Sequence, residues 1–144
     1  EGVARLEGGR VTALPLDADL ARAPVDALAL APDGSLWMAS GSTLARWREG
    51  RLERHPLPPA AIQGRIHSLA VDRGGALWIG HEGGSVRLDE RPAESVIVGH
   101  PVVAFLVPPP DGRDEHVWAG GTSSRLIRMS KDGPRVFDDR LGLH

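Results

Sequence analysis

The sequence predicts an all-β fold made of repeated units, and three observations lead to this expectation. Trp37, Trp78 and Trp118 are spaced by 41 and 40 residues, and a fixed period of this length is typical of repeat architectures. The 18 glycines and 12 prolines are spread along the chain, as expected for many short strands joined by turns. Segments with helical periodicity longer than two turns are hard to find.

The residues around the first two tryptophans align without a gap and predict the first hairpin of each repeat. Residues 25–40 read VDALALAPDGSLWMAS, and residues 66–81 read IHSLAVDRGGALWIGH. Each segment has an apolar strand, a turn with glycine and a strand that contains the tryptophan. The third copy joins residues 102–107 to residues 117–120 through a longer turn at 108–115.

A second hairpin follows each tryptophan. In the first copy residues 44–47 and 51–55 flank a Glu49-Gly50 turn, and in the third copy residues 126–129 and 134–137 flank Asp132-Gly133. Residues 3–15 match this second half alone. Four strands in about 40 residues make one blade of a β-propeller. We therefore expect a β-propeller segment of three complete four-stranded blades and an N-terminal half-blade. The expected boundaries are 1–16 for the half-blade, 25–57, 66–98 and 102–138 for the blades, and 139–144 for the start of a following blade.

Three and a half blades are too few for a closed ring, because propellers close with four to eight. Open blade edges expose unpaired backbone groups and attract partner strands. We therefore expect a segment of a larger, seven-bladed propeller, with the remaining blades supplied by the same parent protein or by another chain. Closure by two copies of this chain ranks second, because the inner hairpins of the half-blades would be missing.

Composition and charge limit the classes of function. The 144 residues are 41% hydrophobic and 25% charged, which is ordinary for one folded domain. Seventeen basic and 19 acidic residues give a net charge of −2, so neither nucleic acid nor an anionic membrane is an expected partner. The chain has no cysteine, which excludes disulfides and thiolate metal sites. No apolar run approaches the length of a membrane span, and no direct membrane contact is expected.

The recurring residues of the repeat are interpreted as architecture. Trp37, Trp78 and Trp118 have equivalent positions, where large indoles can wedge neighbouring blades apart. A platform for stacking sugars is the alternative, but ligand sites are local whereas these residues recur in every copy. Gly80 and Gly120 follow two of the tryptophans and are expected to allow close packing or a tight turn.

Residues that depart from the repeat give the candidate ligand site. The loops after each tryptophan and the connections between blades fall on one face of a propeller, and the second copy places His81 and Glu82 there where the first copy has a small hydroxyl residue. Ordinary solvated loops are the alternative interpretation. The expected ligand-binding residues are His81, Glu82, Arg65, His67, His100, Arg125 and Asp26. The six histidines lack the spacing of metal ligands, and no catalytic motif, metal or cofactor is predicted.

The pattern from Asp72 to Gly80, Asp-Arg-Gly-Gly-Ala-Leu-Trp-Ile-Gly, resembles the two-component regulator propeller repeat. That family typically reads Asp, two spacers, Gly, one spacer and Leu-Trp-Ile-Gly-Thr. The threonine is replaced by Ser40 in the first copy and by His81 in the second. The propeller of streptogramin lyases is a related pattern, but Ile79-Gly80 favours the regulator family.

The resemblance implies the extracytoplasmic, periplasmic sensory region of a bacterial receptor such as a hybrid sensor kinase. In that family a membrane span and a cytoplasmic output domain follow the propeller. The implied role is to bind a small polar ligand such as a carbohydrate and to alter a receptor homodimer, without catalysis in the propeller. A lyase or hydrolase with acid and base residues at the channel mouth, and a protein-interaction scaffold, remain alternatives, and the absence of cysteine is also compatible with the cytoplasm.

Overall fold

The computed structural model describes residues 2–58, 60–89, 94–98, 100–108, 116–122, 125–130 and 133–138. The expected start of a following blade at 139–144 lies outside these residues. Within them the chain forms one two-stranded hairpin and three four-stranded antiparallel sheets. Each sheet follows the chain order from one edge to the other, so consecutive strands are hydrogen-bonded neighbours. This up-and-down arrangement is the expected blade topology.

The strands have the following bounds. The hairpin consists of β1 (Ala4–Glu7) and β2 (Arg10–Ala13). The first sheet consists of β3 (Ala27–Leu30), β4 (Leu36–Ser40), β5 (Thr43–Arg48) and β6 (Arg51–His55). The second sheet consists of β7 (Ile66–Val71), β8 (Leu77–His81), β9 (Gly84–Leu88) and β10 (Glu94–Val98). The third sheet consists of β11 (Val102–Leu106), β12 (Val117–Gly121), β13 (Leu126–Ser130) and β14 (Gly133–Phe137).

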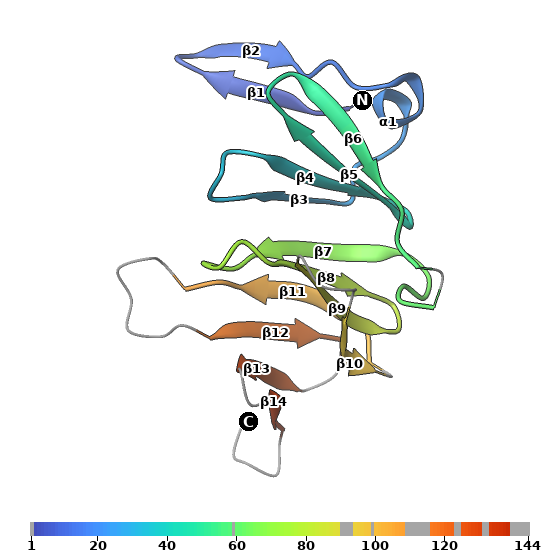
Figure 1. Cartoon of the computed structure of the whole chain (residues 1–144), viewed down its shortest axis with the longest axis vertical. Helices are drawn as coiled ribbons and strands as arrows, with labels where there is room; N and C mark the ends of the chain where they lie inside the picture. Colours follow the sequence, from blue (N-terminus) through green and yellow to red (C-terminus); the bar gives the residue numbers. More distant parts are fainter. Residues whose placement is uncertain are drawn as a thin grey trace.

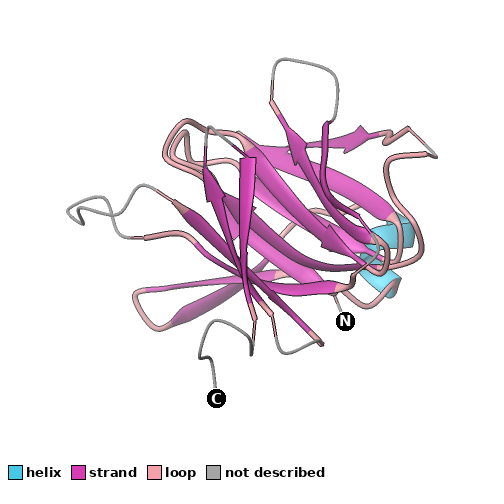
Figure 2. Ribbon diagram, turned by 90° about the horizontal axis from the view of Figure 1, so that it is seen from below, coloured by secondary structure: helices cyan, strands magenta, loops and turns pink. Residues whose placement is uncertain are grey.

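The hairpin and the three sheets follow one another as a stack, with β3, β7 and β11 as the neighbouring inner strands (Figure 1). Strand and loop make up almost all of the described chain, and α1 (Ala18–Arg22) is the one helix within it (Figure 2). The prediction of an all-β propeller segment is therefore confirmed. No helix in the described ranges is long and apolar enough to span a membrane.

Turn chemistry explains how the hairpins close. Glu49 and Gly50 connect β5 to β6, with φ angles of 50° and 81°. Two successive residues at positive φ suit the right-handed twist of a hairpin, and glycine adopts this conformation at no steric cost. Arg48 and Arg51 pair directly across this turn. The turn therefore fixes the register of β5 and β6.

Apolar side chains from neighbouring sheets form the core. Trp37 and Leu44 of the first sheet pack with Ile66, Leu77 and Ile79 of the second sheet. On the other side of the second sheet, Trp78 packs with a cluster from the third sheet: Val102, Val117, Ala119, Ile127 and Met129. Alternation along each strand sends successive side chains to opposite faces. Strand β8 is buried at every position, because a sheet lies on each side of it.

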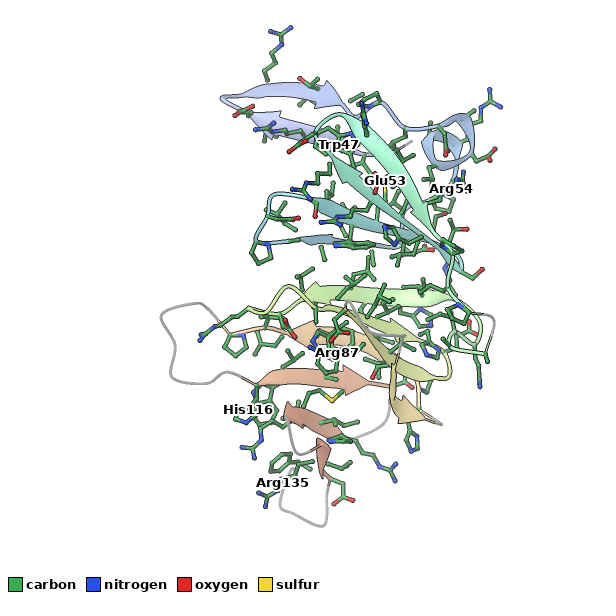
Figure 3. All side chains as sticks on the ribbon, viewed as in Figure 1. Trp47, Glu53, Arg54, Arg87, His116 and Arg135 are labelled. Carbon is green, nitrogen blue, oxygen red and sulfur yellow. The ribbon has the colours of Figure 1, made fainter. Side chains whose placement is uncertain are left out.

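Helix α1 covers part of the free face of the first sheet. Leu20 of α1 packs with Met38 and Ala45, and Trp47 of β5, labelled in Figure 3, packs against this cluster. Helix α1 begins at Asp17, whose side chain accepts a hydrogen bond from the backbone N–H of Leu20 at 3.0 Å. This cap satisfies a donor that the helix leaves free.

An arginine lies across the strand pair from each repeated tryptophan. Arg46, Arg87 and Arg128 pair in register with Trp37, Trp78 and Trp118, and each guanidinium lies 5.2–6.0 Å from the indole centroid. Stacking of this kind uses the flat guanidinium and the electron-rich indole face.

Acidic side chains hold two of these arginines. Nη2 of Arg46 donates a hydrogen bond to Oδ2 of Asp33 at 2.5 Å. Hydrogen bonds from the hydroxyl and the backbone N–H of Ser35 lower the pKa of Asp33 to about 2. Arg87 pairs with Asp89. Arg46 and Arg87 therefore connect the repeated tryptophans to acidic side chains of the same sheet.

Candidate functional site

The candidate site lies where the inner strands begin, at the right-hand edge of the stack in Figure 1. The chain enters β7 at this edge and returns to it at the end of β8, because Ile66 pairs with His81. The β4–β5 turn reaches the same place, since the Ile66 N–H donates to the Gly41 carbonyl at 2.8 Å. The fold thus brings together the first two sheets and the connection between them.

Asp26 and Arg65 form the central pair of the site. The Arg65 Nε donates to Asp26 Oδ2 at 3.0 Å, and its Nη2 pairs with Oδ1. The backbone N–H of Gly41 donates to the same Oδ2 at 2.7 Å. The bonds from Arg65 hold the pKa of Asp26 below its ordinary value, and Asp26 raises the pKa of Arg65. The side chain of Arg65 is still 50% exposed, so part of its guanidinium faces solvent.

His81 has an architectural role that the sequence analysis did not anticipate. Its side chain is 4% exposed, and Nδ1 lies 3.1 Å from the Gly83 nitrogen and 3.2 Å from the Gln63 nitrogen. With its proton on Nε2 the neutral ring accepts both N–H groups, whereas a protonated Nδ1 donates to the Gln63 carbonyl, which is also 3.2 Å away. His81 therefore joins the β8–β9 turn to the β6–β7 connection, and its binding of a ligand stays a prediction.

Stability is expected to fall when the pH drops from 7.5 to 5.5. Burial lowers the pKa of His81 below 6.5, although the nearby Gln63 carbonyl opposes this, and burial also lowers the pKa of His55. Below pH 6.5 the unfolded chain then binds more protons than the folded chain, so acid favours unfolding. Urea denaturation at both pH values measures the loss.

His81→Asn separates the contribution of His81, because the asparagine oxygen can replace Nδ1 as an acceptor and does not titrate in this range. We expect a smaller loss of stability on acidification in this variant, with the remainder due to His55. An equal loss in both proteins would contradict the assignment to His81.

Glu82 and His67 complete the polar group around Arg65. The Glu82 N–H donates to the Arg65 carbonyl at 3.2 Å, and the Glu82 carboxylate acts electrostatically on Arg65. Its Oε2 lies 1.9 Å from the point where a side chain at Gly64 would begin. Gly64 therefore provides the space for Glu82, and its φ of +72° also favours glycine. His67 is half-buried and acts electrostatically on Asp26.

A hollow of about 440 Å3 adjoins this polar group. It is lined by Ser42, Leu57, Pro58, Ile62 and Gly64. Gly64 precedes Arg65 in the chain, and Ser42 follows Gly41, whose N–H donates to Asp26. The hollow itself is lined by apolar residues, a glycine and one hydroxyl, and the Glu82 carboxylate lies against Gly64 at its border.

His100 and Arg125 form a separate pair at the third sheet. The Arg125 guanidinium contacts Nε2 of His100. Within the described ranges, no hydrogen bond or ion pair connects these two residues to the Asp26 group. Five of the seven expected residues, Asp26, Arg65, His67, His81 and Glu82, therefore belong to one local group.

Sequence reasoning missed the backbone partners and the hollow. Gly41 and Gln63 act through main-chain N–H groups, which every residue type other than proline offers, so residue identity gave no signal. Gly64 could have been found as an unusual glycine beside a charged residue. No group of three or more potential ligands for a metal occurs in the ranges that the structure describes.

Comparisons with known proteins give likeness in fold. No protein-family model and no curated protein matches this chain. Catalytically inactive virginiamycin B lyase from Staphylococcus aureus with quinupristin is 17% identical, with a TM-score of 0.70 over 94% of this chain and 47% of that one. YCF48 bound to D1 peptide is 18% identical, with a TM-score of 0.67 over 95% and 46% of the two chains.

The extracellular domain of the hybrid two component system BT4673 from B. thetaiotaomicron is 16% identical, with a TM-score of 0.67 over 90% of this chain and 18% of that one. This chain spans less than half the length of each of the three structures. The likeness shows the fold and leaves the function open. The chain is an all-β segment of the propeller type.

Proposed function

We propose that this segment belongs to the ligand-binding propeller of a bacterial signalling receptor of the two-component type, facing the periplasm or another extracytoplasmic space. The observation that carries the proposal is the hollow beside the Asp26–Arg65 pair. The likeness to the extracellular domain of a hybrid two component system supports the receptor context. Any enzymatic output would lie outside this chain.

The chemistry of the hollow suits a small polar ligand such as a carbohydrate. Arg65 keeps part of its guanidinium exposed while Asp26 fixes its position, so the remaining N–H groups are held ready for ligand oxygens. The exposed Glu82 carboxylate can accept hydroxyl protons. Leu57 and Ile62 offer an apolar wall to the C–H face of a sugar ring.

Calorimetric titration of the parent protein with a panel of neutral disaccharides and oligosaccharides tests this proposal. For any sugar that binds, Arg65→Gln should weaken the affinity at least tenfold, which corresponds to about 1.4 kcal/mol. Arg10→Gln is the matched control, because Arg10 lies in the exposed strand β2. Unchanged affinity in the Arg65 variant would remove this hollow as the binding site.

A lyase and a peptide-binding scaffold are the competing functions, and each has a structural neighbour. A lyase would convert the bound compound, and mass spectrometry of the ligand after incubation would detect the product. A scaffold would bind an extended peptide, and the titrations with sugars would show no binding. In either outcome the sensory proposal fails, whereas reversible sugar binding without a product supports it.

A further inference from the structure

The connection between β6 and β7 packs against the turn between β8 and β9, and two glycines allow this close approach. A Cβ built at Gly83 would lie 2.7 Å from Oε1 and 2.8 Å from Cβ of Gln63. A Cβ built at Gly64 would lie 1.9 Å from Oε2 of Glu82. Each segment thus has a glycine where the other places a side chain. We call this packing of residues 63–65 on residues 81–83 the connection–turn contact.

Backbone hydrogen bonds hold the same contact together. The nitrogens of Gln63 and Gly83 lie 3.2 and 3.1 Å from Nδ1 of His81, and the neutral ring accepts from both when its proton is on Nε2. The Glu82 N–H donates to the Arg65 carbonyl at 3.2 Å. One imidazole therefore connects the two segments, and the bond from Glu82 extends the contact to Arg65.

The connection–turn contact determines where Arg65 and one wall of the hollow lie. Asp26 bonds to the guanidinium of Arg65, whereas the contact holds the Arg65 backbone. Ile62 and Gly64, which line the hollow, flank Gln63 in the chain. Opening of the contact would therefore change both the position of the guanidinium and the shape of the hollow.

A proton on Nδ1 of His81 opposes this arrangement. The protonated ring can donate to the Gln63 carbonyl at 3.2 Å, but it no longer accepts the N–H groups of Gln63 and Gly83. The ring is almost completely buried, and burial of its charge is also unfavourable. Protonation therefore favours a conformation in which the two segments have separated and water reaches the ring.

Besides His81, the polar group contains His67, Glu82, Arg65 and Asp26. His67 of β7 acts electrostatically against the protonation of His81. Glu82 follows His81 in the turn, and Arg65 of the connection pairs with Asp26 of the first sheet. The bonds from Arg65 hold the pKa of Asp26 below its ordinary value, so Asp26 keeps its charge at pH 5.5. His67 is the other histidine of the group, and a variant must separate its contribution from that of His81.

We propose that His81 is a positioning residue for the ligand site: its neutral form keeps the connection–turn contact closed, and its protonation opens the contact, releases Arg65 and weakens ligand binding. The effect on binding rests on the proposed function, whereas the opening needs no ligand. A receptor of this kind binds its ligand at neutral pH and releases it in mild acid.

Amide hydrogen exchange, followed by NMR without ligand at pH 7.5 and 5.5, tests the opening. The N–H groups of Gln63, Glu82 and Gly83 report on the contact, and the N–H of the fully buried Ile79 reports on unfolding of the second sheet. We expect protection factors of the first three at least about tenfold below that of Ile79, which indicates local opening. On acidification they should fall at least about threefold, and about tenfold is the limit for a histidine that titrates at about 6.5 in the open state.

Two results of this measurement would overturn the proposal. Protection of the contact equal to that of Ile79 at both pH values would show that the contact opens only when the whole sheet unfolds. A loss of protection at Gln63 and Gly83 without a loss at Glu82 would show that the Arg65 backbone stays in place.

His81→Asn should reduce the effect of acidification on these amides to less than about twofold, because the asparagine oxygen accepts in place of Nδ1 and does not titrate in this range. His55→Asn is the matched control and should keep the response of the original chain, because His55 is half-buried but packs on Trp37, with ring centroids 4.7 Å apart. A response that persists in His81→Asn would assign it to His67 and overturn the proposal.

Gly83→Ala tests the packing without changing a histidine. Its Cβ would clash with Gln63, whereas a Cβ at Gly120 meets nothing within 4 Å, and neither glycine has a positive φ. At pH 7.5 we expect Gly83→Ala to lower the protection of the Glu82 N–H at least about threefold and Gly120→Ala to change it less than about twofold. Equal protection in the two variants would contradict the positioning of Arg65.

Calorimetric titration of the parent protein at both pH values tests the effect on binding. For any disaccharide or oligosaccharide that binds, we expect at least about threefold weaker affinity at pH 5.5, and less than about a twofold change in His81→Asn. Equal affinity of the unchanged protein at both pH values would overturn the regulation of binding. A panel in which no sugar binds would instead overturn the proposed function, while the exchange measurements would still decide whether His81 controls the opening.

Discussion

Trp78→Ala is expected to lower the free energy of unfolding by about 3–5 kcal/mol, the usual cost of removing a large buried aromatic side chain. The indole is buried between the second and third sheets. Its Nε1 donates to Asp72 Oδ2 at 3.0 Å, and Arg87 stacks on its face. The variant therefore loses apolar packing and leaves a carboxylate oxygen without this donor.

Trp118→Ala is the matched control, because the same residue type occupies the same strand position on the uncovered face of the third sheet. Its cost should be clearly smaller. Urea denaturation followed by circular dichroism measures both. Equal losses in the two variants would show that the interface between sheets contributes little to the role of Trp78.

Leu77→Ala is expected to cost about 2–5 kcal/mol, whereas Leu30→Ala should stay within about 0.5 kcal/mol. Leu77 is 1% exposed and packs between the first and second sheets, but Leu30 is 71% exposed. The two substitutions remove the same atoms from strand positions of similar backbone conformation. The difference between the two losses in free energy of unfolding therefore measures the contribution of burial.

Differential scanning calorimetry of the two leucine variants would show the contrast as a separation of melting temperatures. A melting temperature of the Leu30 variant as low as that of the Leu77 variant would contradict the described packing of β3. It would imply that something covers Leu30 in solution.

The fold could be predicted because the same pattern of strand and turn residues recurs in each repeat. The tryptophan period and the alternation of apolar residues define the hairpins, and Glu49-Gly50 defines a turn. Helix α1 was not singled out, because five residues are too few for a periodic signal. It depends instead on the cap by Asp17 and on Arg54, which pairs with Asp17 across a long sequence separation.

The candidate site could be predicted less completely. The strand order indicates which residues lie at the same end of the sheets, and Asp26, Arg65 and Glu82 do lie together there. The role of His81 depends on backbone N–H groups of a neighbouring connection, and a single sequence does not show such contacts. The binding of a ligand by these residues stays a prediction.

The sheets make their main contacts only with adjacent sheets, as a linear array. In such an array stability is a sum of the intrinsic terms of each unit and the couplings between neighbours. The second sheet has two couplings, and a sheet at the end of the array can open without breaking both of them. Asp26 lies at the start of the first sheet and Arg65 in the connection to the second, so the candidate site spans one coupling, and opening of the first sheet would separate its two halves. A ligand bound across that coupling would therefore be expected to hold the first sheet closed against the second.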